Sequence, residues 1–139
     1  MQLTMQTDYA LRTLMFLASR SERAKIADVA ELFDISINHV AKVVNLLSRY
    51  GYIRSVRGLG GGIEIAKSLD EIRLGDVIER FEGNLHLLEC INTENVCVIQ
   101  PFCKLKGVLA EAERIQLEYL NSVTLADVTP SSRQLMSIT

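Results

Sequence analysis

Residues 36–66, SINHVAKVVNLLSRYGYIRSVRGLGGGIEIA, join a helical pattern to two short strands. Apolar side chains first recur at the three- and four-residue spacing of a helix, with Ser36 as a candidate N-cap and Gly51 at the C′ position. These apolar residues are Ile37, Val40, Ala41, Val44 and Leu47. Residues 52–56 and 63–66 then alternate in the manner of strands. The segment therefore predicts a helix followed by a β-hairpin.

The connection between the two strands, residues 57–62, contains four glycines in six positions. Glycine permits the positive φ angles of a tight tip, and a bare backbone can approach a phosphate or enter a DNA groove. The candidate DNA contacts of this hairpin are Arg57, Gly58, Gly60 and Gly61. A nucleotide phosphate loop is the alternative, but such a loop ends in Lys-Ser/Thr and joins a strand to a helix.

Two further helices are predicted upstream. Residues 3–18 carry an amphipathic helical pattern with Thr4 as a candidate N-cap, and residues 26–33 carry a shorter one that ends near Asp34. The shorter helix and the helix that follows Ser36 are separated by a tight turn, which is the pattern of a helix-turn-helix. Together with the hairpin, these elements predict a winged helix-turn-helix.

The polar face of the predicted second helix of this motif is the candidate reading face for DNA. Its members are Ser36, Asn38, His39, Lys42, Asn45 and Arg49. In a helix-turn-helix this helix enters the major groove, where Asn can pair with adenine and Lys with guanine or phosphate. A solvated helix face is the alternative. His39 on its own is more typical of a surface or capping residue than of a metal ligand.

Charge is distributed unevenly along the 139 residues, of which 48% are apolar and 23% charged. Residues 1–67 hold nine basic and six acidic residues, whereas residues 68–139 hold six and eleven. Within residues 35–67 the balance is five basic to one acidic. The composition predicts one globular domain, and the basic segment indicates an element that faces nucleic acid, with a solvated basic face as the alternative.

The N-terminal residues show no secretory pattern, and no apolar run approaches the roughly 20 residues of a membrane span. These observations predict a cytoplasmic protein without a membrane partner. Thiols stay reduced in that compartment, where clustered cysteines favour metal or redox chemistry over structural disulfides.

The C-terminal half is predicted to contain a short helix over residues 74–81, a loop over residues 84–103 and a long helix that extends to about Leu120. The apolar stripe of the long helix makes it a candidate for packing against its twin in a homodimer. The predicted divisions are a DNA-binding domain over residues 1–83, with its wing at about 52–66, a cysteine-rich loop over 84–103, and a dimerisation helix with its tail over 104–139. Residues after Thr129 are polar and are predicted to be loosely held.

Three cysteines, Cys90, Cys97 and Cys103, lie in the predicted loop, and the chain has no others. An odd number of thiols cannot all pair within one chain, so a ligand set completed from elsewhere is one interpretation. Soft thiolates suit a metal ion or an iron–sulfur cluster. The alternative is three buried small hydrophobes, because free cysteine is often buried.

The order of these features resembles the iron–sulfur winged-helix regulators over essentially the whole chain. The resemblance rests on the wing sequence VRGLGGGI at residues 56–63, the sequence LGDVI at residues 74–78, and three cysteines ahead of a long helix. Residues 1–4 and 7–12 are most similar to the members of that family that repress genes until nitric oxide is present. The fold it implies is mostly α with a small β-wing: a winged helix-turn-helix plus a long C-terminal dimerisation helix.

The resemblance implies that Cys90, Cys97 and Cys103 ligate an iron–sulfur cluster, with four irons and four sulfides favoured and two of each possible. Asp8 of the partner subunit would complete the site. A carboxylate is a harder and more labile ligand than a thiolate, and would leave one iron open to nitric oxide. Without the resemblance, Asp8 is simply an acidic residue favoured in the first turn of a helix.

The fourth ligand has other candidates. Relatives that control cluster assembly carry a histidine three residues after the third cysteine, and here that position is Lys106. This departure argues against their ligand set. His86, four residues before Cys90, could instead complete a zinc site with the three cysteines.

The implied function is a transcriptional repressor, not an enzyme, that binds a pseudo-palindromic double-stranded DNA operator as a homodimer. Its effector would be nitric oxide, and its targets would be genes of nitrosative stress. An iron- or cluster-homeostasis regulator of the same family is an alternative. An iron–sulfur electron carrier is another, but it leaves the basic wing unexplained.

Overall fold

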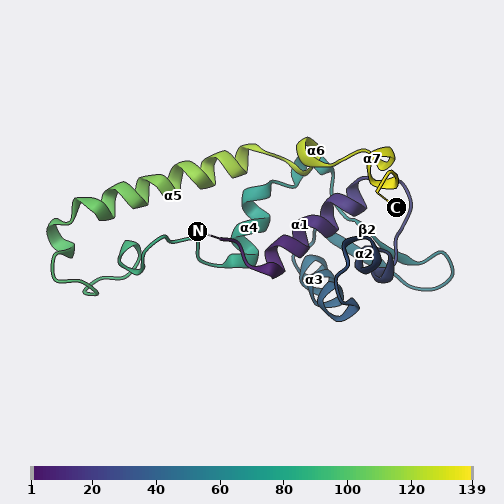
Figure 1. Ribbon diagram of the computed structural model, residues 1–139, viewed down its shortest axis with the longest axis horizontal. Coiled ribbons are helices and arrows are strands. Elements are labelled where there is room, and N and C mark those ends of the chain that lie inside the picture. Colours follow the sequence, from purple (N-terminus) through teal and green to yellow (C-terminus); the bar gives the residue numbers. More distant parts are fainter. Residues whose placement is uncertain (1, 139) are drawn as a thin grey trace.

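Helices dominate the computed structural model, which describes residues 2–138 (Figure 1). The helices are α1 (Met5–Ala18), α2 (Ile26–Phe33), α3 (Ile37–Arg49), α4 (Leu74–Glu82), α5 (Lys104–Ser122), α6 (Leu125–Val128) and α7 (Ser132–Met136). Strands β1 (Ile53–Val56) and β2 (Gly62–Ile65) form one antiparallel hairpin. Short 3₁₀ turns occupy Leu69–Glu71, Glu89–Ile91 and Gln100–Phe102. The predicted class, mostly helical with a small β-wing, is confirmed.

The N-terminal helices begin and end where local chemistry predicts. The Thr4 side chain accepts a hydrogen bond from the amide of Thr7 at 3.3 Å and caps α1. The Ser36 hydroxyl accepts one from the amide of His39 at 3.2 Å and caps α3. These caps satisfy amides that have no partner within the helix, and thereby fix where each helix starts. Asp34 ends α2 in the left-handed conformation.

One hydrophobic core holds the helices and the hairpin together as a head. Its fully buried large side chains are Leu14, Val29, Val40, Val43, Leu47, Ile53, Ile72, Val77 and Leu125. They come from α1, α2, α3, β1, α4, α6 and the connection before α4. Burial of such side chains is the main favourable contribution to folding, so α3 and the hairpin, the two elements predicted to face DNA, share one rigid support.

The hairpin is joined to the α1–α2 connection as well as to itself. Ile53 pairs with Ile65 and Val56 with Gly62 across the two strands. On the outer edge of β2, Ala24 forms an antiparallel bridge with Ile63, with N···O distances of 3.1 and 2.7 Å. This third strand-like contact protects the edge of β2 and ties the wing to the first two helices.

Gly62 is required by this close contact. Its φ is +147°, and a Cβ built there would lie 2.5 Å from the carbonyl oxygen of Ala24. We expect Gly62→Ala to lower the free energy of unfolding by about 1–3 kcal/mol, because the main chain must shift and the backbone is strained. Urea denaturation measures the loss. Gly107→Ala on α5 is the control, since a Cβ there meets nothing within 4 Å; equal effects of the two changes would contradict the prediction.

The C-terminal half forms an arm that leaves the head and returns to it (Figure 1). Residues 83–103 run outward, and α5 leads the chain back toward the head. There the amide of Leu125 donates to the carbonyl of Ile72 at 2.8 Å, and the guanidinium of Arg73 donates to the carbonyl of Asn121 at 2.8 Å. Within residues 2–138, no helix combines the length and apolar character needed to cross a bilayer.

The segment after Thr129 differs from the predicted loose tail. Ser131 caps α7 by accepting from the amide of Gln134 at 3.1 Å, and Leu135 packs against the core of the head. Only a few apolar residues lie in this short stretch, so its sequence lacks a helical period. Tertiary packing supplies the stabilisation that the local pattern does not indicate.

Candidate functional site

The exposed face of α3 presents the side chains predicted to read DNA. All six are exposed: Ser36, Asn38, His39, Lys42, Asn45 and Arg49. The opposite face is buried through Val40, Val43, Val44 and Leu47. One member of the predicted apolar stripe differs, because Ile37 is 57% exposed while Val43 is buried. Ile37 stands at the first helical position, beyond the area that the other helices cover.

Two contacts between α1 and the helix-turn-helix were not found from the sequence. The ring of Tyr9 on α1 lies 6.1 Å from the ring of His39, which places α1 directly beside the start of α3. The guanidinium of Arg12 lies 5.8 Å from the centre of the Phe33 ring on α2. Tyr9 and Phe33 both pack against the core, and the helical period that predicts such packing does not identify their partners. Helix α1 therefore contacts both helices of the helix-turn-helix.

The wing carries its predicted residues on an exposed hairpin. Arg57, Gly58 and Gly60 are exposed, and Gly61 is partly buried where its amide donates to the carbonyl of Gly58 at 3.0 Å. Leu59 at the tip is fully exposed, with a relative exposure of 108%. The predicted strand–turn–strand is confirmed, and it presents a narrow tip with one basic and one apolar side chain.

A charge network at the base of the wing holds this tip. Arg23 donates to the carbonyl of Gly60 at 3.2 Å and pairs with Glu64 at 3.2 Å. Glu64 also accepts from Arg54, its cross-strand partner, at 2.8 Å. The hydrogen bond from Arg54 and the contact with Arg23 hold the pKa of Glu64 below its ordinary value. The opposite charges of Arg54 and Glu64 on facing strands are a sequence signal for this network. Arg23 was missed, because it lies in the connection between α1 and α2.

The cysteine loop presents three free thiols. Cys97 is exposed, Cys90 and Cys103 are partly exposed, and none forms a disulfide. This exposure disfavours the interpretation that they are core hydrophobes. Cys103 is also the N-cap residue of α5, so the third thiol stands at the start of the long helix.

Two side chains fasten this loop. Gln100 donates to the carbonyls of Cys90 at 3.0 Å and Thr93 at 2.6 Å, and accepts from the amide of Val96 at 3.1 Å. It therefore supplies the hydrogen bonds that an irregular backbone cannot form with itself. Glu113 of α5 accepts from the amide of Leu87, and so anchors the loop to the helix.

His86 and Asp8, the two candidates for a fourth ligand, both have partners within the chain. The Nδ1 atom of His86 lies 3.0 Å from the Glu113 carboxylate. Asp8, 46% exposed on α1, is bound by Arg12 at 3.0 and 2.9 Å. Within residues 2–138, no three His, Cys, Asp or Glu side chains gather as a metal-binding group. The three cysteines therefore do not form such a group in this part of the chain, and neither Asp8 nor His86 completes one with them.

The donor set nevertheless suits iron in its chemistry. Three reduced thiols occur on one loop, and one accessible carboxylate occurs on another surface. Thiolates are the usual ligands of iron–sulfur clusters, and an oxygen donor is a chemically reasonable addition. The residues present therefore fit such a cluster, with thiolates as its main ligands.

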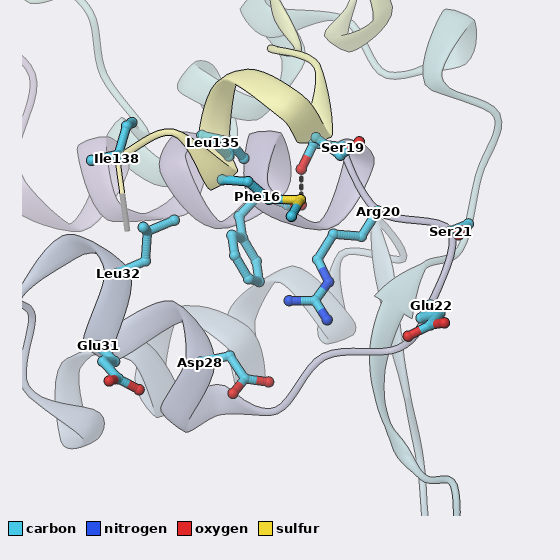
Figure 2. Close-up of a pocket in the computed structure, with 12 residues that line it drawn as sticks. Phe16, Ser19, Arg20, Ser21, Glu22, Asp28, Glu31, Leu32, Leu135 and Ile138 are labelled. Carbon is cyan, nitrogen blue, oxygen red and sulfur yellow. Dashed lines mark hydrogen bonds between the residues drawn. The ribbon is translucent and has the colours of Figure 1, made fainter.

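A separate cleft lies away from these residues. It has a volume of about 950 Å³ and lies between the end of α1, α2 and α7. Figure 2 shows Arg20 beside the Phe16 ring, with Asp28 and Glu31 on the opposite wall. None of the candidate DNA- or metal-binding residues lines it.

Comparison with known proteins identifies the family. The model of the Rrf2 family, described as iron-dependent transcriptional regulators, matches residues 3–131. The chain is 41% identical to the HTH-type transcriptional regulator NsrR of Halalkalibacterium halodurans, over 99% of this chain and 97% of that protein. It is 39% identical to NsrR of Bacillus subtilis with the same coverage.

Solved structures agree on the fold. The global cysteine regulator CymR of B. subtilis superposes with a TM-score of 0.77 at 21% identity, covering 93% of this chain and 96% of that one. IscR of T. potens superposes with a TM-score of 0.73 at 25% identity, covering 91% and 85%. With an exposed helix-turn-helix face, a wing and relatives of this kind over nearly its whole length, the chain belongs to the Rrf2 family of winged-helix transcriptional regulators.

Proposed function

We propose that this chain is a repressor whose operator binding depends on an iron–sulfur cluster and is relieved by nitric oxide, so that it controls genes of nitrosative stress. The observation that carries the proposal is the cysteine loop. The loop that carries three free thiols is held together by Gln100 and anchored to α5 by Glu113, in a chain about 40% identical to NsrR proteins. The exposed face of α3 and the wing supply the DNA-binding side.

The proposed ligands are Cys90, Cys97 and Cys103 of one subunit and Asp8 of the partner subunit. When bound, the cluster would supply an iron with one labile oxygen ligand, at which nitric oxide can react. A four-iron, four-sulfide cluster is favoured, and a two-iron, two-sulfide cluster remains an alternative. His86 is the alternative fourth ligand, and its contact with Glu113 would have to be rearranged for metal binding.

Contacts made by α1 connect Asp8 to the two helices of the helix-turn-helix. Asp8 is bound by Arg12, whose guanidinium also lies against Phe33 of α2. The adjacent Tyr9 contacts His39 at the start of α3. A change in the position of Asp8 therefore acts on both helices of the helix-turn-helix. In this scheme the head has two positions relative to the arm. Binding of Asp8 to the cluster favours one of them.

The proposed homodimer uses α5. This helix has no fully buried residue within the chain. Its exposed large apolar side chains are Leu105, Val108, Ile115 and Tyr119. Pairing along this face would relate two heads by a two-fold axis, and the two α3 helices would then read a pseudo-palindromic operator.

A cluster-homeostasis regulator is the second candidate, because the fold also matches IscR. Nitric oxide separates the two candidates. Anaerobically prepared protein should show cluster absorption with stoichiometric iron and sulfide, and should retard DNA from its own upstream region. Nitric oxide should abolish both properties. An intact cluster with unchanged DNA affinity would exclude the sensing role, and tight binding by the apo form would exclude cluster dependence.

Asp8→Ala tests the fourth ligand. We expect cluster loss to be about tenfold faster with little change in folding, because a half-exposed ion pair with Arg12 contributes only about 0.5 kcal/mol. The decay of cluster absorption in air gives the rate, and thermal unfolding monitors the fold. Glu31→Ala, which removes an exposed carboxylate from α2, is the charge-matched control. Equal cluster lifetimes in the two variants would remove Asp8 from the ligand set.

A further inference from the structure

Leu59 is the most exposed of the large apolar side chains in residues 2–138. It stands at the tip of the wing, between Gly58 and Gly60. An apolar side chain that is fully solvated contributes nothing to the folded core. Its position on the element that faces DNA suggests that its burial occurs in the complex.

The tip is narrow because of its two glycines. Gly58 and Gly60 have φ angles of +94° and +74°, and open space surrounds the position of a Cβ on each. Among residues 58–60, Leu59 is therefore the one that carries a side chain, and this side chain projects from the tip. The minor groove of B-form DNA is about 6 Å wide, which excludes a helix but admits a slim hairpin tip.

Contacts within the chain also hold the tip in place in the absence of DNA. Arg23 donates to the carbonyl of Gly60, and both Arg23 and Arg54 bind Glu64 at the base of the hairpin. The bridge between Ala24 and Ile63 fixes β2 to the α1–α2 connection. These contacts hold the wing at a defined angle to the head, so that little order would have to be gained on binding.

We propose that Leu59 enters the minor groove of the operator beside Arg57 and makes an apolar contact with A·T-rich steps. Apolar wedges are used in this way by minor-groove proteins, which insert them at base steps that open easily. Such a contact is sensitive to the guanine 2-amino group, which projects into the minor groove of G·C pairs alone. Leu59 would thus determine sequence preference at the flanks of the site, while α3 reads the major groove.

The test uses a duplex that the anaerobically prepared wild-type chain selects from a random pool. Two derivatives replace the A·T pairs that face the wing with G·C or with inosine·cytosine pairs. Inosine lacks the 2-amino group, so its pair keeps an A·T-like minor groove although its major groove resembles that of G·C. Fluorescence anisotropy gives the dissociation constants over a range of salt concentrations.

The wild type should bind the A·T and inosine duplexes equally well and the G·C duplex about tenfold more weakly. Leu59→Ala should bind the A·T and inosine duplexes about tenfold more weakly than the wild type does, and the G·C duplex with little change. The salt dependence of its affinity should be unchanged, because no charge is removed. Leu59→Met, which keeps an apolar side chain, should retain the preference. Arg57→Ala should instead reduce the salt slope by about one.

Two results would overturn the proposal. One is wild-type affinity of Leu59→Ala on all three duplexes. The other is an equal loss on all three, since that loss would not depend on the groove. Folding of the variant is not in question, because Leu59 is fully exposed.

Discussion

Replacement of Cys103 by alanine is expected to abolish cluster retention and to lower operator affinity by about 10³-fold, to the level of non-specific DNA binding. The thiol of Cys103 stands at the N-cap of α5, where the loop meets the long helix. Its loss leaves two of the three proposed thiolate ligands, and it removes the one that would connect the cluster directly to α5. Absorption, iron content and gel retardation of the anaerobic protein measure the effect.

The fold should tolerate this change. Cys103 makes no side-chain capping hydrogen bond to α5 and is partly exposed, so its truncation removes little packing. Thr93→Ala is the matched control in the same loop, since Gln100 binds the main-chain carbonyl of Thr93 and the substitution keeps that carbonyl. Full iron content and operator binding by Cys103→Ala would refute the assignment of the cysteine loop as the cluster site.

Leu125→Ala is expected to lower the free energy of unfolding by about 2–5 kcal/mol, the usual cost of a cavity left by a buried leucine. Leu125 has no exposed surface and lies in the core of the head, although it belongs to the chain that follows the arm. Its amide also binds the carbonyl of Ile72. Urea denaturation followed by circular dichroism gives the change in stability.

Val128→Ala on the same short helix is the control for Leu125. Val128 is 37% exposed, so its truncation should cost less than about 1 kcal/mol. If both substitutions cost the same small amount, α6 is not anchored in the core. The proposed transmission from arm to head would then lose its C-terminal connection.

The parts of the fold that the sequence predicted are those fixed by local chemistry. Thr4 and Ser36 cap helices because their hydroxyls satisfy free amides a few residues away, and that spacing is visible in the sequence. The wing follows from two alternating strands around a glycine-rich tip. The exposed face of α3 follows from its helical period, since burial of one side leaves the other in solvent.

The features that were missed depend on contacts between distant residues. The return of Leu125 to the core and the bond from Arg23 to Gly60 join segments that no period relates. Gln100 binds three main-chain groups across an irregular loop, and its sequence gives no sign of this. For the candidate metal site the obstacle is physical, because no three of the candidate ligands gather within residues 2–138.

Helix α5 has a thermodynamic consequence for a protein with this architecture. Its 19 residues include none that is buried within the chain, whereas the head has a complete core. A helix of this length without a buried side chain is marginal in water on its own, and pairing with a second copy in the proposed homodimer would stabilise it. By mass action, the melting of the arm should then shift to higher temperature as protein concentration rises, while that of the head should not. The concentration of the protein would then help to set the state of the proposed switch, independently of the cluster.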